Sequence, residues 1–227
     1  MRILQLISGI TLLFLWGCQP NNAPAEPHIF GDLYVRYLED GQLLKAEASF
    51  FEGDSASAAT PISILGGVTF QGSGMEQRNL RDKLIRYKYE STSDYPGQFT
   101  FQVQDEQGKA RQFQIQMPPV SRFALPDTLL RGNELVIEIY PAPQSQEEEL
   151  SVLCTDSTGK ASLLEIPAPI STQNRVAPAQ LPSLIEGNYQ VYLIRKLRGV
   201  IHEDMYRVSW ELEFYSREAG MRFEYSE

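Results

Sequence analysis

Apolar and polar side chains alternate in short runs along most of the chain. The first clear example is residues 33–50, where two alternating runs flank Asp40-Gly41. Strict alternation is typical of a half-buried strand, and Asp-Gly between two such runs is the strongest short signal for a hairpin. Residues 97–117 repeat the pattern, with Phe and Val or Ile and Met on one face and Gln or Thr on the other. Both segments are predicted to be β-hairpins.

Pro118-Pro119 interrupts the alternation, because proline cannot donate a hydrogen bond to a sheet. Alternating runs resume beyond it, at residues 135–139, 150–155, 163–166, 189–193 and 206–214. The Pro- and Ala-rich residues 167–182 are expected to be irregular. No sustained helical period follows Trp16, and short strands with frequent turns favour sandwiches. The sequence therefore predicts an all-β fold with two tandem β-sandwich domains, residues 29–118 and 119–227.

The first residues determine the expected compartment. Arg2 precedes a mostly apolar run that is shorter than the roughly 20 residues needed to span a bilayer, as in a secretory signal peptide. Leu15-Trp16-Gly17-Cys18 follows, and it resembles the lipobox of bacterial lipoproteins. The alternative is an ordinary signal peptide followed by a chance cysteine. Residues 19–27 contain three prolines and no apolar periodicity.

The lipobox resemblance implies that residues 1–17 are a signal peptide and that acylated Cys18 inserts into membrane lipid. Residues 18–28 are then the lipidated cysteine and a short flexible tether, which keeps the folded part close to the membrane. By resemblance to enterobacterial sorting rules, Gln19 favours the outer membrane. The predicted location is the cell envelope.

A Gly-x-aromatic-x-apolar motif occurs near the end of each half, at Gly97-Gln98-Phe99-Thr100-Phe101 and Gly187-Asn188-Tyr189-Gln190-Val191. It resembles a late strand of immunoglobulin-like domains, and residues 95–105 resemble PKD-type bacterial surface modules. The resemblance implies an immunoglobulin-like sandwich for each half, with Tyr189 as a candidate tyrosine corner. Phe101 and Val191 stand where antibody domains have a cysteine, so no inter-sheet disulfide is expected.

The cysteines and the charge narrow the set of partners. Lipidation of Cys18 leaves Cys154 single, and its place in an alternating run predicts a small buried side chain rather than a reactive thiol. Without residues 1–17 the chain has 19 basic and 29 acidic residues, a formal charge of −10. An acidic chain repels nucleic acid, so nucleic acid is not an expected partner.

No catalytic or cofactor-binding constellation is recognisable. The two histidines, His28 and His202, are expected in a solvated tether and in an exposed turn. Glu147-Glu148-Glu149 is expected to be a solvated loop, and no calcium-loop or phosphate-loop spacing occurs. The sequence therefore predicts no enzyme, no metal and no cofactor.

The C-terminal segment is unusual, because Met221, Phe223 and Tyr225 fall on one face of a final alternating run. Such a run predicts a strand, added either to this chain's own second domain or to a partner's exposed edge. Trp210 shares one face of its strand with four other apolar residues and is expected in the core.

Three roles remain open. The first is a non-catalytic envelope lipoprotein that binds or positions another envelope protein. The second is a binder of glycan or another extracellular ligand, for which exposed aromatic side chains sharing a face would be the sign. The third is an enzyme, which would need a pocket that gathers distant Asp, Glu, Tyr or Ser residues.

Overall fold

The computed structural model describes residues 28–80, 83–104, 108–142, 145, 147–166, 169–181 and 184–225. Within these residues the regular structure is strand, apart from short 3-10 turns, so the all-β prediction is confirmed. The elements are β1 (Ile29–Leu38), β2 (Leu43–Glu52), β3 (Thr60–Ile62), β4 (Val68–Phe70), β5 (Ser73–Gly74), β6 (Glu76–Asn79), β7 (Ile85–Thr92), β8 (Gln98–Gln104), β9 (Ala110–Gln116), β10 (Arg122–Ala124), β11 (Thr128–Leu130), β12 (Leu135–Tyr140), β13 (Glu149–Asp156), β14 (Ala161–Glu165), β15 (Gln173–Val176), η2 (Pro178–Gln180), β16 (Gly187–Glu203), β17 (Tyr206–Tyr215) and β18 (Ala219–Glu224).

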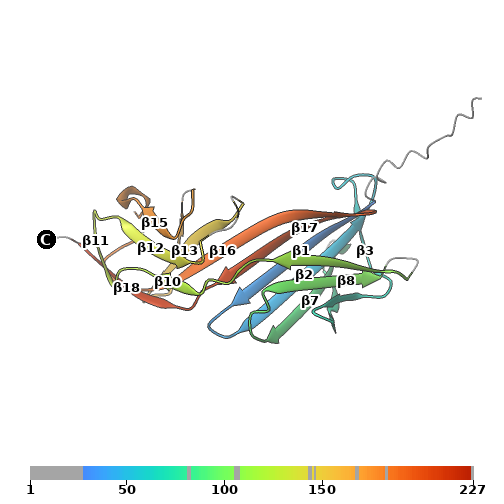
Figure 1. The fold of residues 1–227 in the computed structure, drawn as a ribbon, viewed down its shortest axis with the longest axis horizontal. Coiled ribbons are helices and arrows are strands. Elements are labelled where there is room, and N and C mark those ends of the chain that lie inside the picture. Colours follow the sequence, from blue (N-terminus) through green and yellow to red (C-terminus); the bar gives the residue numbers. More distant parts are fainter. Residues whose placement is uncertain are drawn as a thin grey trace, which may run out of the picture.

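Three sheets make up the described part of the chain. The large sheet has 11 strands and the order β11-β18-β16-β17-β1-β2-β7-β6, with β13 and β14 branching from β16 and β3 from β2. A four-stranded sheet, β5-β4-β8-β9, and a three-stranded sheet, β10-β12-β15, complete the fold. Figure 1 shows the large sheet running along the length of the molecule.

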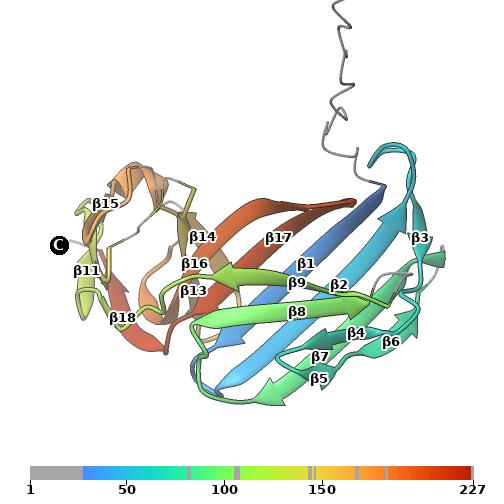
Figure 2. The same cartoon turned by 45° about the vertical axis from the view of Figure 1, so that its right-hand side comes forward.

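The first sandwich forms where the four-stranded sheet covers β1, β2 and β7 (Figure 2). Alternation explains its core, because every second side chain of these strands points inward. Val35 pairs in register with Leu212 and Ala46, and all three are almost fully buried. From the opposite sheet, Phe70 packs on Phe101 with ring centroids 4.7 Å apart. The two hairpins predicted from alternation are β1–β2 and β8–β9.

The second sandwich is also built from alternating strands, and its smaller sheet has three strands. Its inward residues come from β12 in the three-stranded sheet and from β13, β16 and β18 in the large sheet. The buried set is Ile137, Leu150, Val152, Cys154, Val191, Leu193, Met221 and Phe223. Strand β15 lies between residues 167 and 182, the segment predicted to be irregular, and pairs with β12.

One strand belongs to both sandwiches. Strand β16 has 17 residues, pairing with β13 and β18 in its first part and with β17 in its second part. Strand β17 in turn lies parallel to β1 over ten residue pairs, so residues from the C-terminal half complete the first sandwich. The boundary predicted at residue 119 is where the chain leaves the four-stranded sheet, but the large sheet continues across it. The two halves share this sheet.

The two motif glycines have backbone conformations that favour glycine, and Tyr189 bonds to the backbone upstream of it. Gly97 has φ +73° and Gly187 has φ +153°, conformations that side chains with a Cβ rarely adopt. The Tyr189 hydroxyl donates to the carbonyl of Ile185 at 2.9 Å and accepts from the Ile185 N–H at 2.8 Å. This bond to backbone four residues upstream is the geometry of a tyrosine corner.

A buried ion pair lies at the junction of the two sandwiches. Arg195 occupies the inward face of β16 between Leu193 and Leu197 and is 0% exposed. Its Nε donates to Glu148 at 2.6 Å, and its Nη1 donates to the Pro118 carbonyl at 3.3 Å. The prediction that residues 147–149 form a solvated loop is therefore wrong for Glu148, which is buried because it neutralises Arg195.

The C-terminal segment is a strand of the chain's own sheet. Strand β18 pairs antiparallel with β16 and parallel with β11, and Met221 and Phe223 are each 3% exposed. Tyr225 follows the strand and is 44% exposed. Of the two placements left open for this segment, the internal one is observed, because its apolar face covers the second core.

Trp210 is half-buried and packs against the core. It lies beside Gly199 on the neighbouring strand, where a Cβ would come within 2.6 Å of the indole ring. Glycine at this position leaves the space that the ring occupies.

Candidate functional site

One face of the large sheet is not covered by either smaller sheet. We call it the open face and define it by the outward side chains of β1, β2, β7, β16 and β17. Successive side chains of a strand point to opposite faces. The apolar residues of these strands point inward, so the residues between them, which are polar and charged, point outward. Its main members are Asp32, Tyr34, Arg36, Lys45, Glu47, Ser49, Arg86, Lys88, Lys196, Arg198, Ser209, Glu211, Glu213 and Tyr215.

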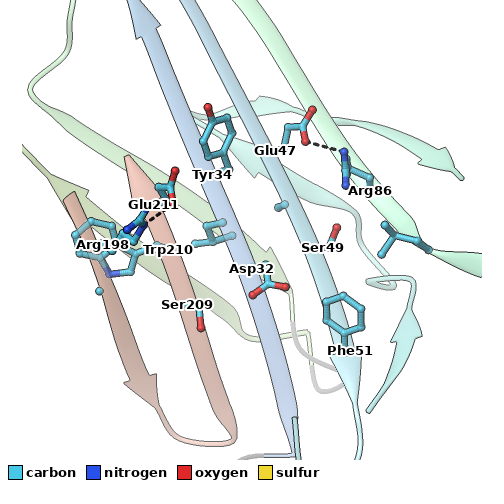
Figure 3. A pocket seen from close by; sticks show the side chains of 14 residues that line it. Asp32, Tyr34, Glu47, Ser49, Phe51, Arg86, Arg198, Ser209, Trp210 and Glu211 are labelled. Atoms are coloured by element: carbon cyan, nitrogen blue, oxygen red, sulfur yellow. Dashed lines mark hydrogen bonds and ion pairs between the residues drawn. The ribbon is translucent and has the colours of Figure 1, made fainter. Parts of the chain in front are cut away.

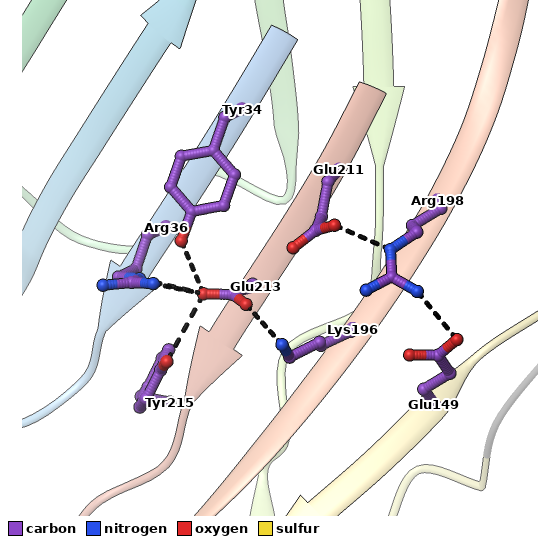
Figure 4. Close-up of polar contacts among 8 residues, drawn as sticks. All are labelled: Tyr34, Arg36, Glu149, Lys196, Arg198, Glu211, Glu213 and Tyr215. Atoms are coloured by element: carbon purple, nitrogen blue, oxygen red, sulfur yellow. Dashed lines mark hydrogen bonds and ion pairs between the residues drawn. The ribbon is translucent and has the colours of Figure 1, made fainter. Parts of the chain in front are cut away.

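Glu213 is the centre of a hydrogen-bond network on this face (Figure 4). Its carboxylate accepts from the Tyr34 hydroxyl at 2.5 Å and from Arg36 Nε at 2.9 Å. Lys196 Nζ lies 2.7 Å from the other carboxylate oxygen, and the Tyr215 hydroxyl donates at 3.4 Å. Glu213 is only 3% exposed, because its partners cover it.

These contacts determine the protonation of the network. Burial alone raises the pKa of Glu213, but the hydrogen bonds from Lys196, Tyr34 and Arg36 outweigh it and lower the pKa to about 2. Burial and the bond to Glu213 raise the pKa of Tyr34 well above its usual value. The carboxylate stays ionised and the phenol stays protonated over the physiological range, so both pKa values lie far from the range that favours acid–base catalysis.

Further ion pairs link neighbouring strands of the open face. Arg198 bridges Glu211 at 2.6 Å and Glu149 at 2.8 Å (Figure 4). Glu47 pairs with Arg86 and Lys88, each at 3.0 Å. Cross-strand pairs of opposite charge stabilise a sheet modestly. The open face is therefore a set of charges that neutralise one another.

A shallow hollow of about 460 Å³ lies in the middle of the open face (Figure 3). Asp32 stands at its centre, in register with Ser49 on β2 and Ser209 on β17. Partial burial raises the pKa of Asp32. A serine nucleophile would need an adjacent base such as histidine, and no histidine lines the hollow within the described residues. The arrangement can hydrogen-bond a ligand but offers no activated nucleophile.

A second depression, of about 360 Å³, lies where the open face passes from one sandwich to the other. We call it the apolar groove. Its walls are mainly Leu38, Leu43, Leu153, Tyr192 and Tyr215, and its rim carries Glu39 and Asp40. It combines an apolar floor with an acidic edge.

The residues singled out in the sequence do not converge. Cys18 lies outside the described residues. His28 and His202 are exposed, and the described residues contain no group of three or more metal-ligating side chains. Cys154 is a buried free cysteine whose pKa is raised by burial to about 11, so it is a core side chain rather than a reactive thiol.

Two features were not predicted. Glu213 and Arg195 both lie in alternating runs, and nothing in the local pattern of Glu213 distinguishes it from other polar residues. A charged residue at an apolar position of the alternation, as Arg195 is after Leu193, is the one local signal of a buried ion pair.

No helix among the described residues is long and apolar enough to cross a membrane. No protein-family model matches the chain, and no curated protein matches it.

Among solved structures, one similar chain is a tetra-tandem repeat from the extending region of a large adhesion protein. It shares 14% identity and a TM-score of 0.26, over 85% of this chain and 49% of that chain. Another comes from a 1.5-MDa bacterial ice-binding adhesin, with 8% identity and a TM-score of 0.21, over 87% of this chain and 65% of that one. This chain therefore spans only about half and about two thirds of their lengths, and such TM-scores do not establish a common fold.

Proposed function

We propose that this chain is a non-catalytic cell-envelope lipoprotein that binds and positions another envelope protein. The observation that carries the proposal is the apolar groove at the junction of the sandwiches. Strand β16, which belongs to both sandwiches, supplies Tyr192 to the groove, so the groove walls come from one continuous sheet. The open face offers no catalytic set among the described residues, which favours binding over chemistry.

The chemistry of the groove suggests what occupies it. Leu38, Leu43 and Leu153 supply apolar surface, and burying such side chains is the main favourable term in protein association. Glu39 is already paired with Arg217 at 3.2 Å, so exposed Asp40 is the carboxylate that favours a partner with a basic residue beside its apolar anchor. The occupant we propose is therefore an apolar segment of an envelope protein, flanked by Lys or Arg.

The anchor is the second part of the proposal. If Cys18 is acylated, the native protein partitions into the detergent phase, and Cys18→Ser releases it into the aqueous phase. Retention of the Cys18→Ser protein on membranes after a high-salt wash would contradict lipid anchoring and leave the groove unaffected.

Binding is tested by affinity capture of the native lipoprotein from detergent-solubilised envelopes. We expect a discrete partner that is retained by the wild type and lost in the double variant Leu43→Ser/Leu153→Ser. Leu65→Ser/Leu130→Ser is the matched control, because both leucines are exposed and neither lines the groove. Equal recovery of the partner by the groove variant, or no partner that depends on the groove, would refute the proposal.

Glycan binding is a second candidate function. The observation that favours it is a surface on the other side of the first sandwich, where uncharged polar side chains replace the ion pairs of the open face.

A further inference from the structure

The outer face of the four-stranded sheet is polar but carries no charge. Strands β8 and β9 contain one charged residue, Arg111, whose side chain points inward and is buried. The chain as a whole has 22% charged residues, and the open face is built from ion pairs. We call this surface the glutamine face and define it by Thr69, Gln98, Thr100, Gln102, Gln104, Gln112, Gln114 and Gln116.

The glutamine face is a regular array. Gln98 pairs with Gln116, Thr100 with Gln114, and Gln102 with both Gln112 and Thr69. Strand geometry places these side chains about 4.8 Å apart across the sheet and roughly 6.8 Å apart along each strand. The array therefore extends over roughly 10 Å across the strands and roughly 20 Å along β8, on the side of the sheet that faces away from β1 and β2 (Figure 2).

The backbone beneath the array is held firmly. The inward residues between the glutamines, such as Phe99, Phe101 and Phe113, are fully buried. Where β4 ends, the side chain of Gln71 continues the ladder, donating to the Gln98 carbonyl at 2.8 Å and accepting from the Thr100 N–H at 3.2 Å. The outward side chains thus project from fixed positions into solvent.

The side chains define the ligand that fits. Each glutamine presents two N–H donors and a carbonyl acceptor, and each threonine presents a hydroxyl that can donate or accept. A ligand rich in uncharged hydroxyl groups matches this alternation of donors and acceptors. A charged polymer finds no counter-charge here, and a typical protein partner finds none of the aromatic, Met or Arg side chains that dominate protein interfaces. The face also lacks the exposed aromatic side chains expected of a glycan site, so recognition here depends on hydrogen bonds alone.

We propose that the glutamine face binds a neutral glycan, which lies along β8 and β9 and exchanges hydrogen bonds with the glutamine amides. This goes beyond the proposed protein-binding function, because the glutamine face and the apolar groove lie on different sides of the molecule. The two sites can therefore fail independently.

The test uses the full chain on an array of neutral glucan, mannan and galactan oligosaccharides beside uronic-acid and sialylated oligosaccharides. We expect binding to a neutral oligosaccharide, with an affinity that changes little between about 50 and 500 mM salt, because no charges are screened. The isosteric variant Gln112→Glu/Gln114→Glu should lower that affinity about tenfold or more, since it removes donors and adds repulsion for carbohydrate oxygens.

Gln173→Glu/Gln190→Glu is the matched control, because it makes the same change at two exposed glutamines of the second sandwich. It should leave glycan affinity unchanged, and equal thermal unfolding of the two variants shows that the fold is retained. No binding to neutral oligosaccharides, binding only to acidic ones, or equal loss in both variants would overturn the proposal. So would a concentration-dependent dimer that Gln112→Glu/Gln114→Glu dissociates, since the face would then bind a second copy.

Discussion

Glu213 shows how a single acidic residue can be buried on an otherwise exposed sheet face. Its partners come from the start and the end of the chain, since Tyr34 and Arg36 lie in β1 and Lys196 in β16. Each partner is itself partly exposed, so polar side chains rather than apolar core residues bury Glu213. The free energy of the network therefore depends on one carboxylate being ionised.

That dependence predicts how stability changes with pH. The pKa of Glu213 falls from its usual value of 4.5 in the unfolded chain to about 2 in the fold. Stabilisation by this group is therefore complete above about pH 4.5 and is lost as the pH falls toward 2. Glu213→Gln should lower the free energy of unfolding at pH 7 by roughly 2–3 kcal/mol and flatten its decline between pH 4.5 and 2.

Urea unfolding across this pH range measures both effects. Glu134→Gln serves as the control, because Glu134 pairs with Arg175 in an exposed position and should contribute less than about 1 kcal/mol. Equal pH profiles for the wild type and Glu213→Gln would contradict the low pKa.

At the scale of elements, β18 shows how an alternating run finds its partner. Its inward residues, Met221 and Phe223, close the second core, while its backbone pairs with β16 on one side and β11 on the other. The short strand β11 joins the large sheet through its hydrogen bonds to β18. The C-terminal run is thus a structural part of the second sandwich.

Removing an inward side chain of β18 should therefore lower the free energy of unfolding. Phe223→Ala should destabilise the isolated protein by about 3–5 kcal/mol, because a large side chain is removed from a closed core. Tyr225→Ala should cost about 1 kcal/mol or less, since Tyr225 is 44% exposed and its ring contacts the Arg131 guanidinium at 4.9 Å and the edge of the Phe223 ring at 6.1 Å. Thermal unfolding compares the two variants, and similar small losses in both would mean that the strand contributes little to the core.

At the scale of the whole molecule, the two sandwiches behave as one body in this geometry. They share β16, and β17 from the C-terminal half pairs with β1 from the N-terminal half. Arg195 joins Glu148 to the carbonyl of Pro118, at the place where the chain crosses between the smaller sheets. Separating the sandwiches would expose this ion pair and split the large sheet.

We therefore expect a single unfolding transition. In a Cys18→Ser protein that lacks residues 1–17, Trp210 fluorescence reports on the first sandwich and the thiol of Cys154, which is 0% exposed, reports on the second. Their urea midpoints should coincide. Arg195→Met should lower the free energy of unfolding by about 3–5 kcal/mol and lower both midpoints together, because it leaves Glu148 buried without a counter-charge. Two separate midpoints would show that the halves fold independently.

The sequence by itself determined which side of each long strand is apolar, since alternation depends only on neighbouring residues. The β1–β2 and β8–β9 hairpins and the burial of Cys154 follow from such local patterns, whereas the Tyr189 corner was implied by the resemblance to immunoglobulin-like domains. Only the tertiary structure decided the parallel pairing of β1 with β17 and the burial of Glu148 and Glu213. These depend on partners far away in the sequence, 47 residues for Arg195 and Glu148 and 179 for Tyr34 and Glu213. A local pattern specifies a face, but the neighbour that covers it, or the counter-charge that permits burial, is set by the packing of the whole chain.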